Sequence, residues 1–370
     1  ILKVESINFS IKNEREQQAI IEQFQKFLNA LDFNVQVVMN TVEINLNSYL
    51  NTLKTDKKFD KNLEDYKKYL TSILNDKGIM NRDFYLIIKK NINTELSIHV
   101  SICIEKLTNI GLRVKQLNKR ELEELLKSFF SNKVEDKDLG NIQVTKDNFL
   151  HYLIAPNSIK NNVDYLIING KYNRIITAYG YPRSVELGFL DRIITLNGDF
   201  DLSLHIEPFS IETMMINLNK ELQKQRADLY SASLKSSINP SLEIKYEDTR
   251  KILEELQKGK EKLFNVSLYI NCKADTIEEL NLLTRKVEAE LNSLMIIPKT
   301  PSFRMLQGLK STTPFSSNLL KIKRTITTEA LRAFFPFTSS FLNIDDSGVW
   351  FGLNKNNIPI IKDIFKLSNP

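Results

Sequence analysis

Cysteine and histidine are scarce in this chain, which has 2 cysteines and 3 histidines among its 370 residues. Cys103 and Cys272 are far apart, so they form neither a disulfide framework nor the close spacing of a zinc site. We expect both to be buried as small apolar side chains. His99, His151 and His205 stand roughly fifty residues apart, with no cysteine or carboxylate at ligand spacing. We expect His99 to be structural and His205 to face solvent from the polar side of a strand, so no metal site is predicted.

Long hydrophobic runs are also missing, because no stretch of about 18 or more consecutive apolar residues occurs. The sequence therefore predicts no transmembrane helix. Residues 1–5 lack the basic and apolar regions of a signal peptide, and they lack an initiator methionine. We therefore expect a segment cut from a longer, cytosolic protein.

Nucleotide-binding glycine motifs are absent too. No Gly-x-x-x-x-Gly-Lys-Ser/Thr sequence occurs, and neither does a G-x-S-x-G or H-E-x-x-H motif. Residues 308–312 end like a phosphate-binding loop but lack its glycines, and Gly259-Lys260 is followed by a glutamate instead of a hydroxyl residue. The sequence thus predicts no catalytic residue, no cofactor-binding residue and no triphosphate bound in the usual P-loop manner.

Positive and negative charges are nearly balanced, since 51 basic and 45 acidic residues give a net charge of +6. This small excess gives weak support to a nucleic-acid-binding protein. The hydrophobic share of 42% and the charged share of 26% are ordinary for a globular protein. A chain of this length is expected to form two or three domains.

Residues 1–132 alternate between strand and helix patterns. Apolar residues at helical spacing predict helices near 14–31, 46–75, 96–110 and 119–129. Asn13 and Glu16 have the spacing of a capping box, and Gly111 is placed to end the third helix. Strands are expected near 3–11, 33–39, 84–88 and 112–117. This order predicts an α/β sandwich module, followed by a polar linker at 133–149.

Residues 150–312 predict a second, α+β module. Residues 200–206 and 264–272 alternate strictly between apolar and polar types, which is typical of strands with one core face and one polar face. Helical patterns at 211–231 and 246–259 lie between these strands, and another follows at 276–293. We interpret the arrangement as a split βαβ unit, which predicts a ferredoxin-like plate.

The remaining residues, 313–370, contain the most distinctive motifs. A Phe-Pro-Phe-Thr stretch at 335–338 precedes two strand patterns at 348–353 and 358–365, which we expect to form a hairpin through turn residues 354–357. Together with residues 329–334, this segment resembles the approach to the motor domain of type IV secretion ATPases of the TraC/TrbE/CagE family, the fourth VirB component. Residues 180–183 and 201–208 are similar to the middle region of that family, and residues 4–9 and 27–36 to its amino-terminal module.

The resemblance covers most of the chain in order, and it implies a role. The expected fold is α+β, with two α/β sandwich modules and then the entry strands of a RecA-like ATPase domain at 313–370, truncated before its Walker A motif. ATP and magnesium are expected only in that missing motor domain. The implied protein is cytoplasmic, peripheral to the inner membrane and oligomeric when full-length. Its implied partners are inner-membrane secretion-channel subunits and its own ATPase domain.

Two groups of residues are candidate interfaces. Tyr181, Pro182 and Arg183 combine aromatic, rigid and cationic side chains on one loop, a composition enriched at interfaces, although Pro182 also suits a purely structural turn. Phe334, Phe335 and Phe337 are either an anchor onto the motor domain or core residues beneath it.

Two other classes of function remain. A nucleic-acid-binding module is the main alternative, but the polar residues of strand 200–207 include Asp201 and Glu207, which repel phosphate. An independent small-molecule enzyme has no supporting constellation of residues. We therefore expect a non-catalytic docking region, with no direct binding of nucleic acid.

Overall fold

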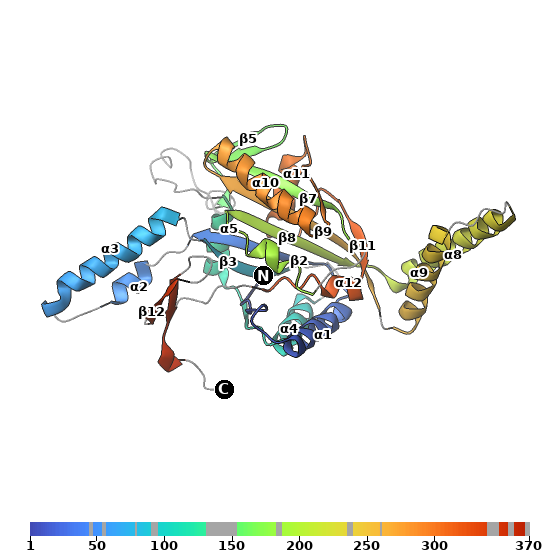
Figure 1. The fold of residues 1–370 in the computed structure, drawn as a ribbon, viewed down its shortest axis with the longest axis horizontal. Coiled ribbons are helices and arrows are strands. Elements are labelled where there is room, and N and C mark those ends of the chain that lie inside the picture. Colours follow the sequence, from blue (N-terminus) through green and yellow to red (C-terminus); the bar gives the residue numbers. More distant parts are fainter. Residues whose placement is uncertain are drawn as a thin grey trace.

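An antiparallel sheet of 11 strands runs through the molecule in the computed structural model, and helices pack on it (Figure 1). The protein is therefore a mixed α+β structure, as expected from the sequence. The structure describes residues 1–43, 47–53, 57–77, 80–89, 95–130, 154–182, 187–234, 240–259, 261–338, 348–353 and 359–366. The linker expected at 133–149, His151, Arg183 and the hairpin turn expected at 354–357 lie outside these ranges.

The first half of the sheet comes from the amino-terminal part of the chain. Its elements are β1 (Leu2–Val4), α1 (Glu14–Ala30), β2 (Val35–Glu43), α2 (Asn47–Thr52), α3 (Asp60–Lys77), β3 (Met80–Ile88), α4 (Leu96–Asn109), β4 (Val114–Gln116) and α5 (Lys119–Phe130). The strands lie side by side in the order β4-β1-β3-β2, and every neighbouring pair is antiparallel.

The second half has a similar set of elements. They are β5 (Ile159–Asn161), β6 (Leu166–Ile168), β7 (Lys171–Gly180), α7 (Asp191–Ile194), β8 (Phe200–Pro208), α8 (Ile211–Leu234), α9 (Pro240–Gln257), β9 (Leu263–Ala274), α10 (Ile277–Ser293), β10 (Ile297–Lys299) and α11 (Met305–Thr312). Strand β7 pairs with β10, β9 pairs with both β7 and β8, and all of these pairs are antiparallel. Strands β6 and β5 extend the sheet beyond β7.

The two halves repeat one order of elements. Each runs strand, helix, strand, helical insertion, strand, helix, strand, helix, and its four strands have equivalent neighbours: β4-β1-β3-β2 in one half and β10-β7-β9-β8 in the other. Strands β2 and β8 are equivalent, and they pair antiparallel with each other over five residues, Val35–Met39 against Leu202–Ile206. An antiparallel pair of equivalent strands relates the halves by an approximate two-fold rotation. The described strands of the ranges 1–132 and 150–312 thus belong to one continuous sheet.

Helices cover both faces of this sheet. On the apolar face, α1, α4 and α10 contribute Phe24, Cys103, Val287 and other fully buried side chains to the largest hydrophobic core. On the opposite face, α5 packs through Leu125 and Phe129, and α11 packs through Met305 and Leu309. Gly308 of α11 approaches β7 so closely that an added Cβ would lie 2.8 Å from Ile175, which explains the glycine at this position. Residues 308–312 are therefore a helix packed on the sheet.

The last described segments divide between the sheet and a separate hairpin. Strand β11 (Arg324–Thr327) pairs with β9, and α12 (Thr328–Arg332) follows it. Strands β12 (Val349–Leu353) and β13 (Pro359–Lys362) form a second, two-stranded antiparallel sheet, which confirms the expected hairpin. Trp350 of that hairpin stacks edge-on against Tyr69 of α3.

Two helical arms project from the sheet at opposite sides of the molecule (Figure 1). One consists of α2 and α3 and the other of α8 and α9. Each arm is the insertion between the second and third strands of its half, so the approximate two-fold rotation places the arms at opposite ends. Helices α8 and α9 pack along one another as an antiparallel pair.

Several local predictions are confirmed. Asn13 and Glu16 form the expected capping box at the start of α1, with Glu16 N–H donating to Asn13 Oδ1 at 3.0 Å. Gly111 follows α4 with φ of +94°, a left-handed conformation that glycine adopts without strain. Cys103 and Cys272 are free and buried.

Candidate functional site

A cluster of charged side chains is buried where the two halves of the sheet meet. Arg82 lies on β3, Asp201 on β8 and Lys273 on β9, while Lys171 begins β7 and Asp199 immediately precedes β8. Arg82, Asp201 and Lys273 are 5%, 1% and 8% exposed. A buried charge is costly unless a partner compensates it. The contacts of each side chain in this cluster therefore show which charges are compensated.

The two lysines and two aspartates form a connected set of ion pairs. Lys171 Nζ lies 2.6 Å from Asp199 Oδ2, and Lys273 Nζ lies 3.2 Å from Asp199 Oδ1 and 3.0 Å from Asp201 Oδ1. The backbone N–H of Thr41, at the end of the β2–β8 junction, also donates to Asp201 Oδ1 at 3.0 Å. Residues from both halves of the chain therefore meet on one carboxylate.

Arg82 is held mainly by backbone oxygens. Its guanidinium donates to the carbonyls of Ile194, Leu196 and Gly198 at 3.3, 2.9 and 2.8 Å and to the Thr41 hydroxyl, and it lies 4.3 Å from the centre of the Phe200 ring. These contacts fix the loop that leads from α7 into β8. Since all of the contacts named here are with neutral groups, they leave the positive charge of Arg82 without a bonded carboxylate.

Burial and charge act against each other in this cluster. Burial alone raises the pKa of Asp199, but Lys273 and Lys171 outweigh it and hold that pKa below its usual value. Burial lowers the pKa of Lys273, yet Asp201 and Asp199 outweigh it and raise that pKa. Burial lowers the pKa of Arg82 to about 10, which still leaves the guanidinium charged at neutral pH. Arg82 and Lys273 thus remain cationic beside a deprotonated Asp199.

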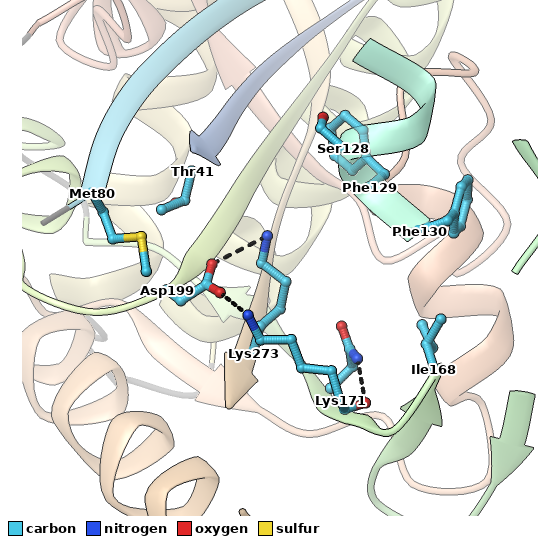
Figure 2. Close-up of a pocket in the computed structure, with 10 residues that line it drawn as sticks. Thr41, Met80, Ser128, Phe129, Phe130, Ile168, Lys171, Asp199 and Lys273 are labelled. Carbon is cyan, nitrogen blue, oxygen red and sulfur yellow. Dashed lines mark hydrogen bonds and ion pairs between the residues drawn. The ribbon is translucent and has the colours of Figure 1, made fainter. Parts of the chain in front are cut away.

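A cavity of about 170 Å³ opens beside the cluster (Figure 2). Lys171, Lys273 and Asp199 form one wall, and Ser128, Phe129 and Phe130 at the end of α5 form another. The remaining lining residues are Thr41, Met80, Ile168 and Asn173. The cavity combines two ammonium groups with an apolar wall. Its residues come from six separate segments of the chain, so no sequence motif could have revealed it.

The prediction that His205 faces solvent is wrong. His205 is 3% exposed, and its neighbours on the same strand face, Asp201 and Ser203, are 1% and 0% exposed. Its Nε2 lies 2.7 Å from the carbonyl oxygen of Ser311 in α11. The alternation of polar and apolar residues was interpreted correctly, but α11 and the segment after it cover the polar face. The polar side chains are therefore buried in hydrogen bonds instead of being solvated.

This covered face forms a polar seam over the β2–β8 junction. Gln36 Nε2 donates to Ser203 Oγ at 2.8 Å and to the Thr313 carbonyl at 2.9 Å, and the Ser316 N–H donates to Gln36 Oε1 at 2.7 Å. Burial lowers the pKa of His205, although the Ser311 carbonyl and Glu207 oppose this. The neutral imidazole is consequently the form that the folded protein favours. His99 stacks on Phe33 with ring centres 3.8 Å apart, as its structural role predicts.

The two candidate interface segments meet inside the protein. Tyr181 packs on Phe334, with ring centres 5.6 Å apart, and Pro182 is partly buried beside it. Phe334, Phe335 and Phe337 are 2%, 0% and 0% exposed. Phe335 contacts the rings of Phe9 and Phe24, which belong to the first half of the chain. Of the two alternatives left by the sequence, the core role fits these contacts.

No protein-family model matches the chain, and no curated protein does either. Within the described ranges, His, Cys, Asp and Glu side chains form no group of three that would hold a metal ion. None of the described helices is long and apolar enough to cross a membrane.

The Phe335→Ala variant tests the core role of the phenylalanine cluster. Removing this fully buried ring should lower the free energy of unfolding by about 3–5 kcal/mol, because the site loses apolar burial and retains a cavity. Urea denaturation measures the change. Phe365→Ala is the control, since Phe365 is 93% exposed and should change stability by about 0.5 kcal/mol or less. Equal effects of the two variants would contradict the assignment.

The buried His205 predicts acid sensitivity. Its folded pKa is lowered from 6.5, so below that pH the unfolded state binds more protons and stability falls as pH decreases. The loss should reach a slope of up to about 1.4 kcal/mol per pH unit before the folded protein is itself protonated. His205→Gln keeps an N–H donor for the Ser311 carbonyl and should flatten this slope between pH 7 and 5. If the free energy of unfolding had the same pH dependence in the wild type and in the variant, the prediction would be wrong.

Proposed function

We propose that this chain is the non-catalytic docking region of a conjugative type IV secretion ATPase of the TraC/TrbE/CagE family. The assignment to this family is based on short segments that resemble it in the same order along most of the chain. In this proposal the parent protein uses ATP to drive pilus assembly and DNA transfer, and ATP and magnesium bind only in a motor domain beyond these residues. The chain itself binds inner-membrane secretion-channel subunits at the cytoplasmic side of that membrane.

In this proposal the chain divides into two α/β sandwich modules, the second of them ferredoxin-like, and the entry strands of a truncated motor domain. The strand order β10-β7-β9-β8, with all neighbours antiparallel, supports the ferredoxin-like assignment of the second module. The equivalent order β4-β1-β3-β2 extends the assignment to the first. The hairpin of β12 and β13, which pairs with no strand of the main sheet, suits the entry strands of a RecA-like domain.

The observation that carries a docking role is the exposed apolar stripe of the α8–α9 arm. Ile216, Tyr230 and Leu234 of α8 are 56%, 68% and 71% exposed. Tyr230 and Leu234 follow Ile216 by 14 and 18 residues, which is close to four and five turns of about 3.6 residues, so the three side chains share one side of the helix. Tyr230 and Leu234 lie one turn apart near the tip of the arm, and large apolar side chains exposed together on a projecting element are typical of a protein-binding surface.

The core of this arm is complete only where it joins the sheet. Met214, Leu253 and Leu256 are buried near the base, whereas Ile244 near the tip is 54% exposed. Two helices alone cannot bury a full apolar face, and a partner helix laid along the stripe would remove this surface from water. The base therefore provides stability, and the outer part is available for a partner.

The covered sheet supports docking over nucleic-acid binding. A sheet that binds single-stranded nucleic acid stacks bases on aromatic side chains of an open face. Here α1, α4 and α10 pack on one face, and α5 and α11 pack on the other. At the β2–β8 junction, the polar side chains of Gln36, Ser203 and His205 are buried in the seam beneath α11.

A capture experiment tests the docking role. The chain, immobilised at its carboxyl end, is offered each inner-membrane secretion component encoded beside it, one at a time and in detergent. The double variant Tyr230→Ser, Leu234→Ser should weaken capture of one component at least tenfold, because both large apolar side chains are lost. Circular dichroism checks that the arm stays helical.

A matched surface variant gives the control. Ile11→Ser removes an apolar side chain that is 76% exposed but lies outside the arm, and it should leave capture unchanged. Capture of no component by the wild type, or equal capture by the double variant, would refute the docking role. ATP hydrolysis by the purified chain would refute its non-catalytic part.

A further inference from the structure

The cavity beside the buried charged cluster has an excess of positive charge. Its lining contains two cations, Lys171 and Lys273, and one carboxylate, Asp199. Asp201 pairs with Lys273 but does not line the cavity, and burial raises its pKa. A buried excess of this kind is costly unless an anion offsets it, because the interior screens charge poorly.

Hydrogen-bond donors are also in excess on the cavity wall. An ammonium group has three N–H donors, and Lys171 Nζ gives one of them to Asp199 Oδ2. Lys273 Nζ directs two of its donors to Asp201 Oδ1 and Asp199 Oδ1, at 3.0 and 3.2 Å. Asn173 spends one N–H on the backbone carbonyl of Lys171, and its oxygen already accepts from Asn271. Several N–H groups of these three lining residues are therefore available to an acceptor in the cavity.

The other wall is formed by the end of α5 and is largely apolar. The cavity lies at the carboxyl end of α5, where free carbonyls would repel negative charge. The Phe130 carbonyl, however, accepts a hydrogen bond of 2.7 Å from Asn169 Nδ2, and Ser128 Oγ accepts one of 2.7 Å from Asn40. The rings of Phe129 and Phe130 and the side chain of Ile168 offer an apolar surface across from the lysines (Figure 2).

We propose that this cavity binds a small molecule with one oxyanion group, a carboxylate or a phosphate, held by Lys171 and Lys273. The volume of about 170 Å³ equals roughly six waters at about 30 Å³ each, which suits a ligand of a few heavy atoms. The Lys171 side chain is 23% exposed at the rim and the Lys273 side chain 9% exposed, so the ligand enters past Lys171. An apolar part of the ligand lies against Phe129 and Phe130.

The site has a structural consequence for the fold. Its residues belong to β7, β9, α5 and the ends of β2 and β3, so a bound anion links the two halves of the sheet at one point. Ligand binding therefore stabilises the junction of the halves by mass action, since the site does not exist in the unfolded chain. This inference does not depend on the proposed docking role.

Titration calorimetry with butyrate and, separately, inorganic phosphate tests the site at constant ionic strength. We expect saturable binding of at least one probe, and which one binds identifies the oxyanion. Lys171→Gln should weaken that binding at least tenfold, because the charge at the entrance is lost. Lys171→Arg keeps the charge and should stay within about threefold of the wild type.

Two comparisons keep the result interpretable. Lys224→Gln removes an exposed lysine from the α8–α9 arm and should leave the dissociation constant unchanged. The melting temperature of the wild type should rise with the binding probe, and that of Lys171→Gln should not. No saturable heat with either probe, or equal affinity in wild type and Lys171→Gln, would overturn the proposal.

Discussion

The antiparallel pairing of β2 with β8 is the constraint on which the rest of this structure depends. It spans five residues on each strand, and it turns two edge strands into the centre of one sheet. Side chains hold both ends of the junction: Gln36 bonds to Ser203 at one end, and the Thr41 amide bonds to Asp201 at the other. A shift of β8 by one residue relative to β2 would move Leu204 out of the apolar core and break both contacts. The junction therefore sets the geometry of the seam and of the charged cavity together.

The two faces of the sheet are held to their covering helices by different interactions. The face beneath α1, α4 and α10 is apolar, and its stabilisation comes from burial of side chains such as Phe24 and Val287. The face beneath α11 is polar along the junction, and each buried group there needs a specific partner. Hydrogen bonds of this kind add little net stability, but a lost partner is costly, so they favour one arrangement over its competitors. The polar face thus contributes mainly to the specificity of the way the halves meet.

Local features were predictable from sequence, while the relation between distant segments was not. The Asn13 capping box, the end of α4 at Gly111 and the β12–β13 hairpin each depend on a few neighbouring residues. His205 was placed wrongly because alternation along a strand tells which residues share a face but not what covers that face. The charged cavity could not be foreseen, because Lys171, Asp199 and Lys273 lie on three segments that only the sheet brings together. The sequence does not reveal the repeated order of elements, because the equivalent helices differ in length: α1 has 17 residues and α7 has 4.

The short α7 explains how the phenylalanine segment belongs to both halves. In the first half, α1 covers the apolar face with a long helix, whereas α7 covers little of the equivalent surface in the second. Phe334 lies there instead, against Phe189 and Tyr181, while Phe335 and Phe337 reach Phe24 and Phe84 of the first half. A segment from beyond the repeat therefore completes the apolar core and crosses the junction between the halves.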